Sequence, residues 1–591
     1  MAATIDGPND ANGLLPGHEP MDRLVHGTRL GQGISPPGAV RRYPPPRMSI
    51  PRTFVLVAFT SSVLFAQVAP EQFEAIKKQG LENSQVMAHL DHLVNRIGPR
   101  LTSSDNLTVA CEWARDTFAG FGIENARLEQ WGKFAVGFNR GPWWGRMTKP
   151  EPMDIVCNTD AWTAGTRGPA RGPLLRSPKT EEELAAMKGK LAHVWLLNPG
   201  GPPLLTEIMA AMESEGGLGF VSGGRDLLLT DGKPNVDFAN LPKLPFVRVR
   251  SDCYKTLVKH LDDGKDVEVE FDIRNHFRKG PIALFNVLAD IVGTEHPDEY
   301  VVVGGHIDSW DGATGATDNG TGTATTLEAA RILMAIGAKP RRTIRFMLWS
   351  GEEQGLLGSL AWVQKHKEEM PKYSACLVHD GGTNYISGIA GMKEMEPQLT
   401  TAFEPVFKLS DEMPFKIRHI DAFRPIGSDH EAFTGADVPG FFWNQAGKAN
   451  YMHTHHTQYD TYGAAIPEYQ MHSSVVIATG ALGLANLPEL LTRENMKVQP
   501  RFGGGGGGGG GNLRRLGVRL GENDTTIVLV TEGSIAARAG LKAGDKIVRI
   551  GDKKVASPEE YRAAVSQGPA KNTVTFVRNG EEQTVEVTFA R

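Results

Sequence analysis

The stretch Tyr300–Gly322, YVVVGGHIDSWDGATGATDNGTG, decides the fold class of this 591-residue chain. Its apolar start, Tyr300–Val303, predicts a buried strand, which is followed by His306 and Asp308 in an H-x-D arrangement. Asp318 lies in a turn of small residues, and the apolar residues at helical spacing that follow it predict a helix: Leu327, Ala330, Leu333 and Met334. Ligands in open α/β sheets bind at the carboxyl ends of strands. The stretch therefore predicts the functional site of an α/β domain.

Other predicted strands end in similar residues. Thr343–Trp349 is followed by Glu352 and Glu353, and Ala375–Val378 is followed by Asp380. Adjacent residues point in different directions, so one glutamate can bind a metal while the other faces the substrate. Each motif alone is common, since a glutamate pair often begins a solvated helix. Strands that repeatedly end in the residue types a metal needs, each followed by glycine, are poorly explained by chance.

These residues fit a pair of divalent ions that share one carboxylate. Imidazole and carboxylate are the ligands of such ions, and two ions about 3.5–4 Å apart can clamp a nucleophilic water. The chain supplies five candidates, which are His306, Asp318, Glu353, Asp380 and His456. Glu352 remains as the general base that takes the proton of the water. The ligand types suit zinc, manganese and cobalt alike.

The motifs HIDSWD (306–311), GATDNGTG (315–322), SGEEQGLLGS (350–359) and HHTQYDT (455–461) resemble those of the dizinc exopeptidases, the family of bacterial leucyl aminopeptidases and carboxypeptidase Q. The resemblance covers roughly residues 70 to 495 and implies an α/β/α sandwich. It places His306 and Asp380 on one zinc ion, Glu353 and His456 on the other, and Asp318 between them. It also makes Glu352 the base and Asp308 the residue that orients His306.

The resemblance also selects among the late histidines. Only His456 fits the family pattern His-Thr/Ser-x-x-Asp-Thr, whereas His453 and His455 do not. The family often has a tyrosine just before this ligand, which helps to hold the oxyanion; His455 stands there in this chain. Asp429 lies in Gly427–His430, which resembles a substrate-proximal loop of the family. A turn with a helix cap explains Asp429 equally well.

The chain is too long for one core, and composition divides it into domains. The peptidase domain is predicted at residues 70–135, which look helical, and at 276–495. The insertion at 140–275 alternates predicted strands, such as Lys190–Leu197, with helices, and resembles a protease-associated domain; an unrelated small α/β domain is the alternative.

A glycine-rich linker is predicted at residues 496–511, before a mostly-β unit at 512–591 that resembles a PDZ domain. Its turn Leu516–Gly517–Val518 would hold the C-terminal carboxylate of a peptide.

The N-terminal region carries targeting signals rather than fold. Residues 1–47 are predicted to be disordered or to precede the true start, and 48–66 read as a signal peptide. The protein is then secreted or periplasmic, without a stable membrane span after cleavage. The net charge of −5 argues against nucleic acid as a partner, and homo-oligomers are compatible with the sequence. The four cysteines form no C-x-x-C pair and are predicted to be buried thiols, with one or two disulfides as the alternative.

The sequence thus predicts a secreted metal-dependent exopeptidase that hydrolyses short peptides or dipeptides at a dizinc site. Aminopeptidase, dipeptidase and carboxypeptidase-like action all remain open. One alternative is an inactive peptidase-fold scaffold or receptor that acts through its PDZ domain. Another is a one-zinc enzyme like glutaminyl cyclase.

Overall fold

The computed structural model describes residues 67–198, 204–499, 516–521, 524–530, 534–567, 569 and 571–588. The predicted N-terminal segment, the signal peptide and most of the predicted linker lie outside the described residues. Within the described part of the chain, none of the helices combines the length and apolar character needed to cross a bilayer. All four cysteines are buried and unpaired, which confirms the prediction of free thiols.

Parallel strands form the centre of the peptidase region. In order across the sheet they are β14 (Gly440–Phe442), β11 (Tyr373–Val378), β9 (His296–His306) and β10 (Arg342–Trp349). The next strand, β8 (Glu268–Ile291), runs antiparallel to β10. Every residue of β10 and β11 is buried, as expected for parallel strands that are covered on both faces. The three strands predicted here from apolar runs are confirmed.

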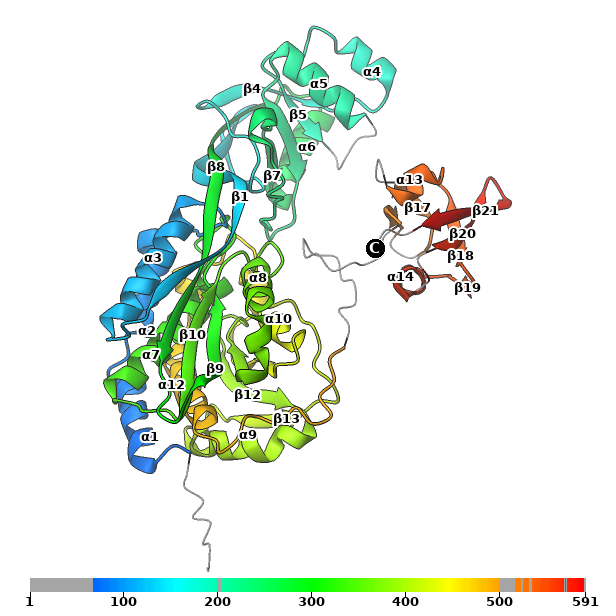
Figure 1. Cartoon of the computed structure of the whole chain (residues 1–591). Helices are drawn as coiled ribbons and strands as arrows, with labels where there is room; N and C mark the ends of the chain where they lie inside the picture. The colour runs from blue at the N-terminus through cyan, green and yellow to red at the C-terminus, as the bar shows by residue number, and fades with distance from the viewer. Residues whose placement is uncertain are drawn as a thin grey trace, which may run out of the picture. The chain divides into compact units, whose positions relative to one another are not determined.

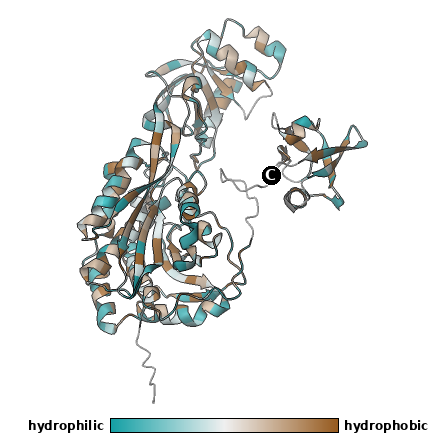
Figure 2. Cartoon of the chain, viewed as in Figure 1, coloured by the Kyte–Doolittle hydropathy of each residue, from teal (hydrophilic) through white to brown (hydrophobic). Residues whose placement is uncertain are grey.

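Helices cover both faces of these strands (Figure 1). Val301 and Val303 of β9 face a core cluster that includes residues of α1 (Pro70–Lys77), α2 (Val86–Asp91), α3 (Asp105–Gly120), α7 (Thr321–Ala335), α9 (Glu396–Phe403) and α12 (Pro467–Ala485). Val302 faces the opposite cluster, with residues of α8 (Leu357–Lys365) and α10 (His430–Thr434). Figure 2 shows hydrophobic residues along the central strands. The predicted α/β/α sandwich is confirmed.

Two long strands carry the chain into the inserted region. Strand β1 (Arg127–Lys149) pairs with β8 in antiparallel register from Arg127↔Leu288 to Lys149↔Glu268 (Figure 1). The prediction that residues up to 135 are helical is therefore wrong from Arg127 onward, because pairing with β8 overrides local preference. The predicted strand Lys190–Leu197 begins only at Trp195, since Lys190 lies in a turn closed on Met187.

The insert places helices against a second group of parallel strands. Its elements are β2 (Met153–Ile155), β3 (Cys157–Asn158), β4 (Ala170–Arg176), α4 (Glu181–Ala186), β5 (Trp195–Asn198), α5 (Leu205–Glu215), β6 (Gly219–Gly223), β7 (Phe246–Val249) and α6 (Ser251–Asp262). Strands β4, β5, β6 and β7 are parallel neighbours, and β4 pairs antiparallel with the outer part of β8. A separate small sheet of the peptidase region holds β12 (Tyr385–Gly391), β13 (Lys416–His419) and β15 (Asn444–Ala446).

The C-terminal region has a core of its own. Its elements are β16 (Val518–Leu520), β17 (Ile527–Val530), α13 (Ile535–Arg538), β18 (Lys546–Ile550), β19 (Lys553–Lys554), α14 (Pro558–Gln567), β20 (Lys571–Arg578) and β21 (Glu581–Thr588). All of its strand pairs are antiparallel. Leu516, Ile547, Val574 and Phe576 are buried in one cluster. The mostly-β prediction for this region is confirmed.

Candidate metal centre

The predicted ligands lie at the carboxyl ends of neighbouring strands. His306 is the last residue of β9, Glu353 follows β10 and Asp380 follows β11. Strand β9 lies between β10 and β11, so these side chains meet at one edge of the sheet. Asp318 comes from the loop before α7, and His456 from the loop after the short helix α11 (Tyr451–Thr454).

His306, Asp318 and Asp380 form the first group. The Nε2 atom of His306 lies 3.0 Å from Oδ1 of Asp380 and 3.4 Å from Oδ1 of Asp318. The other ring nitrogen, Nδ1, lies 3.1 Å from the carbonyl oxygen of Asp308 and 3.6 Å from its carboxylate. Asp308 therefore fixes the ring so that Nε2 faces Asp318 and Asp380.

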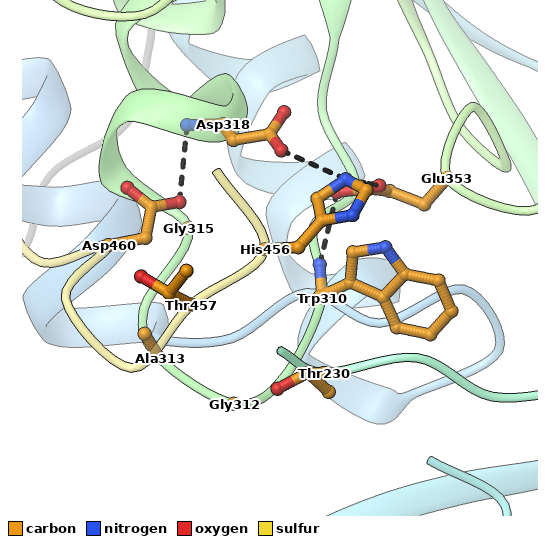
Figure 3. A pocket seen from close by; sticks show the side chains of 10 residues that line it. All are labelled: Thr230, Trp310, Gly312, Ala313, Gly315, Asp318, Glu353, His456, Thr457 and Asp460. Atoms are coloured by element: carbon orange, nitrogen blue, oxygen red, sulfur yellow. Dashed lines mark hydrogen bonds and ion pairs between the residues drawn. The ribbon is translucent and has the colours of Figure 1, made fainter. Parts of the chain in front are cut away.

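Asp318, Glu353 and His456 form the second group (Figure 3). The Nε2 atom of His456 lies 3.0 Å from Oε2 of Glu353 and 3.2 Å from Oδ2 of Asp318. Asp318 thus directs one carboxylate oxygen toward each histidine. His455 stacks on His456 with ring centroids 3.8 Å apart, and its Nε2 lies 3.8 Å from Asp318.

Glu352 lies beside the first group. Its carboxylate is 3.9 Å from Nε2 of His306, and its side chain is 10% exposed. The backbone N–H groups of Glu352 and Glu353 each approach a different oxygen of Asp308, at 3.3 Å, and Thr102 donates a further hydrogen bond to it. Asp308 therefore orients His306 and also accepts hydrogen bonds from the backbone of the turn that carries Glu352 and Glu353. The sequence did not reveal this second role.

Carboxylates crowd the site and shift its proton affinities. Burial opposes protonation of His456, but Glu353 and Asp318 raise its pKa to about 11. Burial raises the pKa of Glu353 to about 7, and the nearby Asp318 adds to this effect. Burial also raises the pKa of Glu352 well above its usual range, against the opposing charge of His306. Such an excess of buried carboxylates is costly unless cations balance it.

Sequence reasoning missed residues that hold the ligand loops. Arg100 is fully buried and donates to the carbonyl oxygens of Ile307 (2.7 Å) and Gly315 (2.8 Å). It thereby braces the segment between His306 and Asp318. Asp460 accepts hydrogen bonds from the backbone N–H groups of Thr317 (2.6 Å) and Asp318 (3.2 Å). The family motif contains Asp460, whereas no local signal marks Arg100.

Asp429 is fully buried, and neither of its carboxylate oxygens has a hydrogen-bond partner among the described residues. It precedes α10 but makes no side-chain cap bond to that helix. Asp429 thus occupies the N-cap position of α10, but its carboxylate does not cap the helix. Burial raises the pKa of Asp429 to about 7.

A narrow cavity of about 10 Å³ opens beside the second group, with room for about one water molecule (Figure 3). Asp318, Glu353 and His456 line it together with Trp310, whose backbone N–H donates to Glu353 at 3.2 Å. Thr230 also lines the cavity, so the insert forms part of the wall of the site.

Comparison with known families identifies two parts of the chain. Residues 286–479, which include all five predicted ligands, match the model of Peptidase family M28. The chain carries an M28 peptidase domain. Residues 526–579 match the model of a PDZ domain.

Relatives of the peptidase domain are consistent with this assignment. Carboxypeptidase Q of Bos taurus is 26% identical over 438 residues, which span 68% of this chain and 85% of that protein. Carboxypeptidase Q of Rattus norvegicus is 31% identical over 218 residues, 35% of this chain and 43% of that protein. A solved peptidase M28 precursor from Shewanella amazonensis shares the fold, with a TM-score of 0.52 and 21% identity over 73% of this chain and 98% of that one.

Proposed function

We propose that this protein is an extracytoplasmic exopeptidase that hydrolyses short peptides or dipeptides with two zinc ions. The observation that carries the proposal is the position of Asp318, with one carboxylate oxygen 3.4 Å from His306 and the other 3.2 Å from His456. One carboxylate placed between two imidazoles is suited to bridge two cations. The M28 match and the similarity to carboxypeptidase Q support peptide hydrolysis.

The donor set fits zinc. His306 and Asp380 would hold one ion, Glu353 and His456 the other, and Asp318 both, with nitrogen and oxygen donors of the kind that zinc accepts. Bound ions would supply Lewis-acid polarisation of the scissile carbonyl and would lower the pKa of the attacking water. They would also balance the charge of the buried carboxylates Asp318, Glu353 and Asp380.

Glu352 is suited to move the proton. Its carboxylate lies 3.9 Å from Nε2 of His306, and Asp308 accepts a hydrogen bond from its backbone N–H. It would take the proton of the attacking water and deliver it to the leaving amine. Burial lowers the pKa of His455, so its imidazole is neutral near pH 7 and could donate a hydrogen bond to the developing oxyanion.

Two further parts of the proposal rest on sequence. The pattern of residues 48–66 supports export, and the PDZ domain supports binding of peptide C-termini near the Leu516–Gly517–Val518 turn. A flexible linker would let the PDZ domain raise the local concentration of substrate. The insert remains a predicted protease-associated domain.

The test combines metal content with turnover. The protein without residues 1–66 is analysed for bound zinc and assayed on free dipeptides, amino-terminal reporters and carboxyl-terminal reporters. Glu352→Gln should lower the hydrolysis rate by about 10²- to 10⁴-fold while zinc stays bound. Glu368→Gln, at an exposed helix position, is the matched control and should leave the rate unchanged.

Each alternative gives a different result. Near-stoichiometric binding of two zinc ions with release of amino acids supports the exopeptidase, and the active reporter class gives its polarity. One bound ion with cyclisation of N-terminal glutamine would favour the cyclase. Absence of turnover, with retained peptide binding by the PDZ domain, would favour the scaffold. Unchanged hydrolysis by zinc-loaded Glu352→Gln would overturn the assignment of the base.

A further inference from the structure

A loop of the insert lies directly against the loop that carries His456. The backbone N–H of Thr230 donates to the carbonyl oxygen of His456 at 2.8 Å. Leu229 and Thr457 form an isolated antiparallel bridge beside this bond. The insert therefore touches the main chain of a predicted metal ligand itself, rather than only the rim of the site.

Gln458 strengthens this contact with both ends of its side chain. Its Oε1 accepts a hydrogen bond from the backbone N–H of Leu228 at 2.8 Å. Its Nε2 donates to the carbonyl oxygen of Asp226 at 3.1 Å. The side chain of Gln458, two residues after His456, thus makes hydrogen bonds to two backbone groups of the insert loop.

The insert loop is fixed to its own domain, so it can act as a support. Asn158 of β3 donates to the carbonyl oxygen of Leu229 at 3.2 Å. Arg248 of β7 donates to the same oxygen at 2.5 Å and pairs with Asp160 at 2.9 Å. A continuous path of hydrogen bonds therefore runs from the strands of the insert to the backbone of His456.

The backbone of His456 needs such support. Its φ is +59°, in the left-handed region that residues other than glycine seldom adopt. A conformation of this kind persists where surrounding contacts determine it, and it is often found at functional sites. Two contacts with the insert restrain this segment. Thr230 of the insert donates a hydrogen bond to His456, and Leu228 of the insert donates one to Gln458.

We propose that Gln458 is a positioning residue through which the insert holds His456 in place, so that the insert sets the affinity of the metal ion bound by His456 and Glu353. This inference rests on the proposed metal site. It implies that the contact through Gln458 is coupled to one of the two ions and not equally to both, since His306 and Asp380 come from β9 and the turn after β11.

The test measures stepwise zinc affinity by competition with a chromophoric chelator. Gln458→Ala should weaken one of the two ions about tenfold, in the range seen when residues that support metal ligands are removed. The weakened ion should be the one that His456→Ala loses. Gln458→Leu, which nearly keeps the side-chain volume and removes both hydrogen bonds, should give the same result and replaces Gln458→Ala if that variant does not fold.

Gln398→Ala is the matched control, because Gln398 also brackets backbone groups, those of Leu490 and Thr492, away from the site. It should leave both affinities unchanged. Wild-type affinities in the Gln458 variants, or an equal fall at both sites, would overturn the inference. Failure of the wild-type protein to bind two zinc ions would instead refute the proposed function, so the two failures are distinguishable.

Discussion

Replacing Arg140 by methionine should destabilise the junction between the insert and the peptidase domain by about 3–5 kcal/mol. The guanidinium of Arg140 lies 2.9 Å from Asp311 of the HIDSWD motif, and both side chains are only 3% exposed. It also donates to the hydroxyl (2.6 Å) and the carbonyl oxygen (2.9 Å) of Thr159. Methionine keeps much of the apolar contact, so the main cost is the buried carboxylate of Asp311, which loses its counter-charge.

Thermal unfolding followed by tryptophan fluorescence is a suitable assay, because Trp162 and Trp310 pack at this junction with ring centroids 6.3 Å apart. The single variant should lower Tm by about 3–6 °C. The double variant Arg140→Met/Asp311→Asn should recover part of this loss, since it removes the unpaired charge. A Tm of Arg140→Met close to that of the wild type, or a double variant whose loss equals the sum of the two singles, would refute this reasoning.

Three further predictions concern the metal centre and the PDZ domain. Removal of metal by a chelator should abolish dipeptide hydrolysis. Zinc at about 100 times its Kd should restore hydrolysis and add about 2.7 kcal/mol to the free energy of unfolding per ion. Hydrolysis that survives complete removal of metal would exclude a role of metal in catalysis. In the metal-free protein the pKa of His456 is raised to about 11, so the folded state binds this proton more tightly than the unfolded chain. That stability is fully present below pH ~6.5 and is lost as pH rises toward 11, so Tm of the metal-free protein should fall from pH 6.5 to 9, whereas a Tm that rises would contradict the assignment. Gly517→Val should abolish binding of C-terminal peptides in a fluorescence titration but leave dipeptide hydrolysis unchanged. Gly517 has φ +84°, and a Cβ there would lie 2.2 Å from Cβ of Ser534. A peptide with an amidated C-terminus is the control, and unaltered binding of the free-acid peptide would show that the binding site is not at this turn.

Three of the predicted metal ligands could be recognised in the sequence because they follow apolar runs. Strand ends at His306, Glu353 and Asp380 are marked by glycines and by the change from apolar to polar residues. In a parallel sheet this local signal also fixes where the side chains meet, since neighbouring strands end at the same edge. The choice of His456 and the division of these residues between two ions came instead from the family resemblance, because His456 lies in a loop after α11 and not at a strand end.

The supports of the site could not be predicted in this way. Arg100 acts on residues more than two hundred positions later in the chain, and Thr230 bonds to His456 and Leu228 to Gln458 across a similar separation. The start of β1 at Arg127 was missed because its partner β8 is far away in sequence. Such contacts depend on tertiary pairing, for which a single sequence carries no periodic signal.

The pairing of β1 with β8 makes the insert a replaceable module. Val136 lies opposite Lys279, and Gly137 opposite Arg278, on adjacent antiparallel strands. Paired residues on such strands lie about 5 Å apart, so a turn of about two residues could join them after the intervening chain is removed. The insert could therefore be replaced by a hairpin turn without changing the pairing of the strands that precede His306 and Glu353. A protein shortened in this way would keep the proposed metal ligands but would lose the hydrogen bonds that the insert makes to the His456 loop.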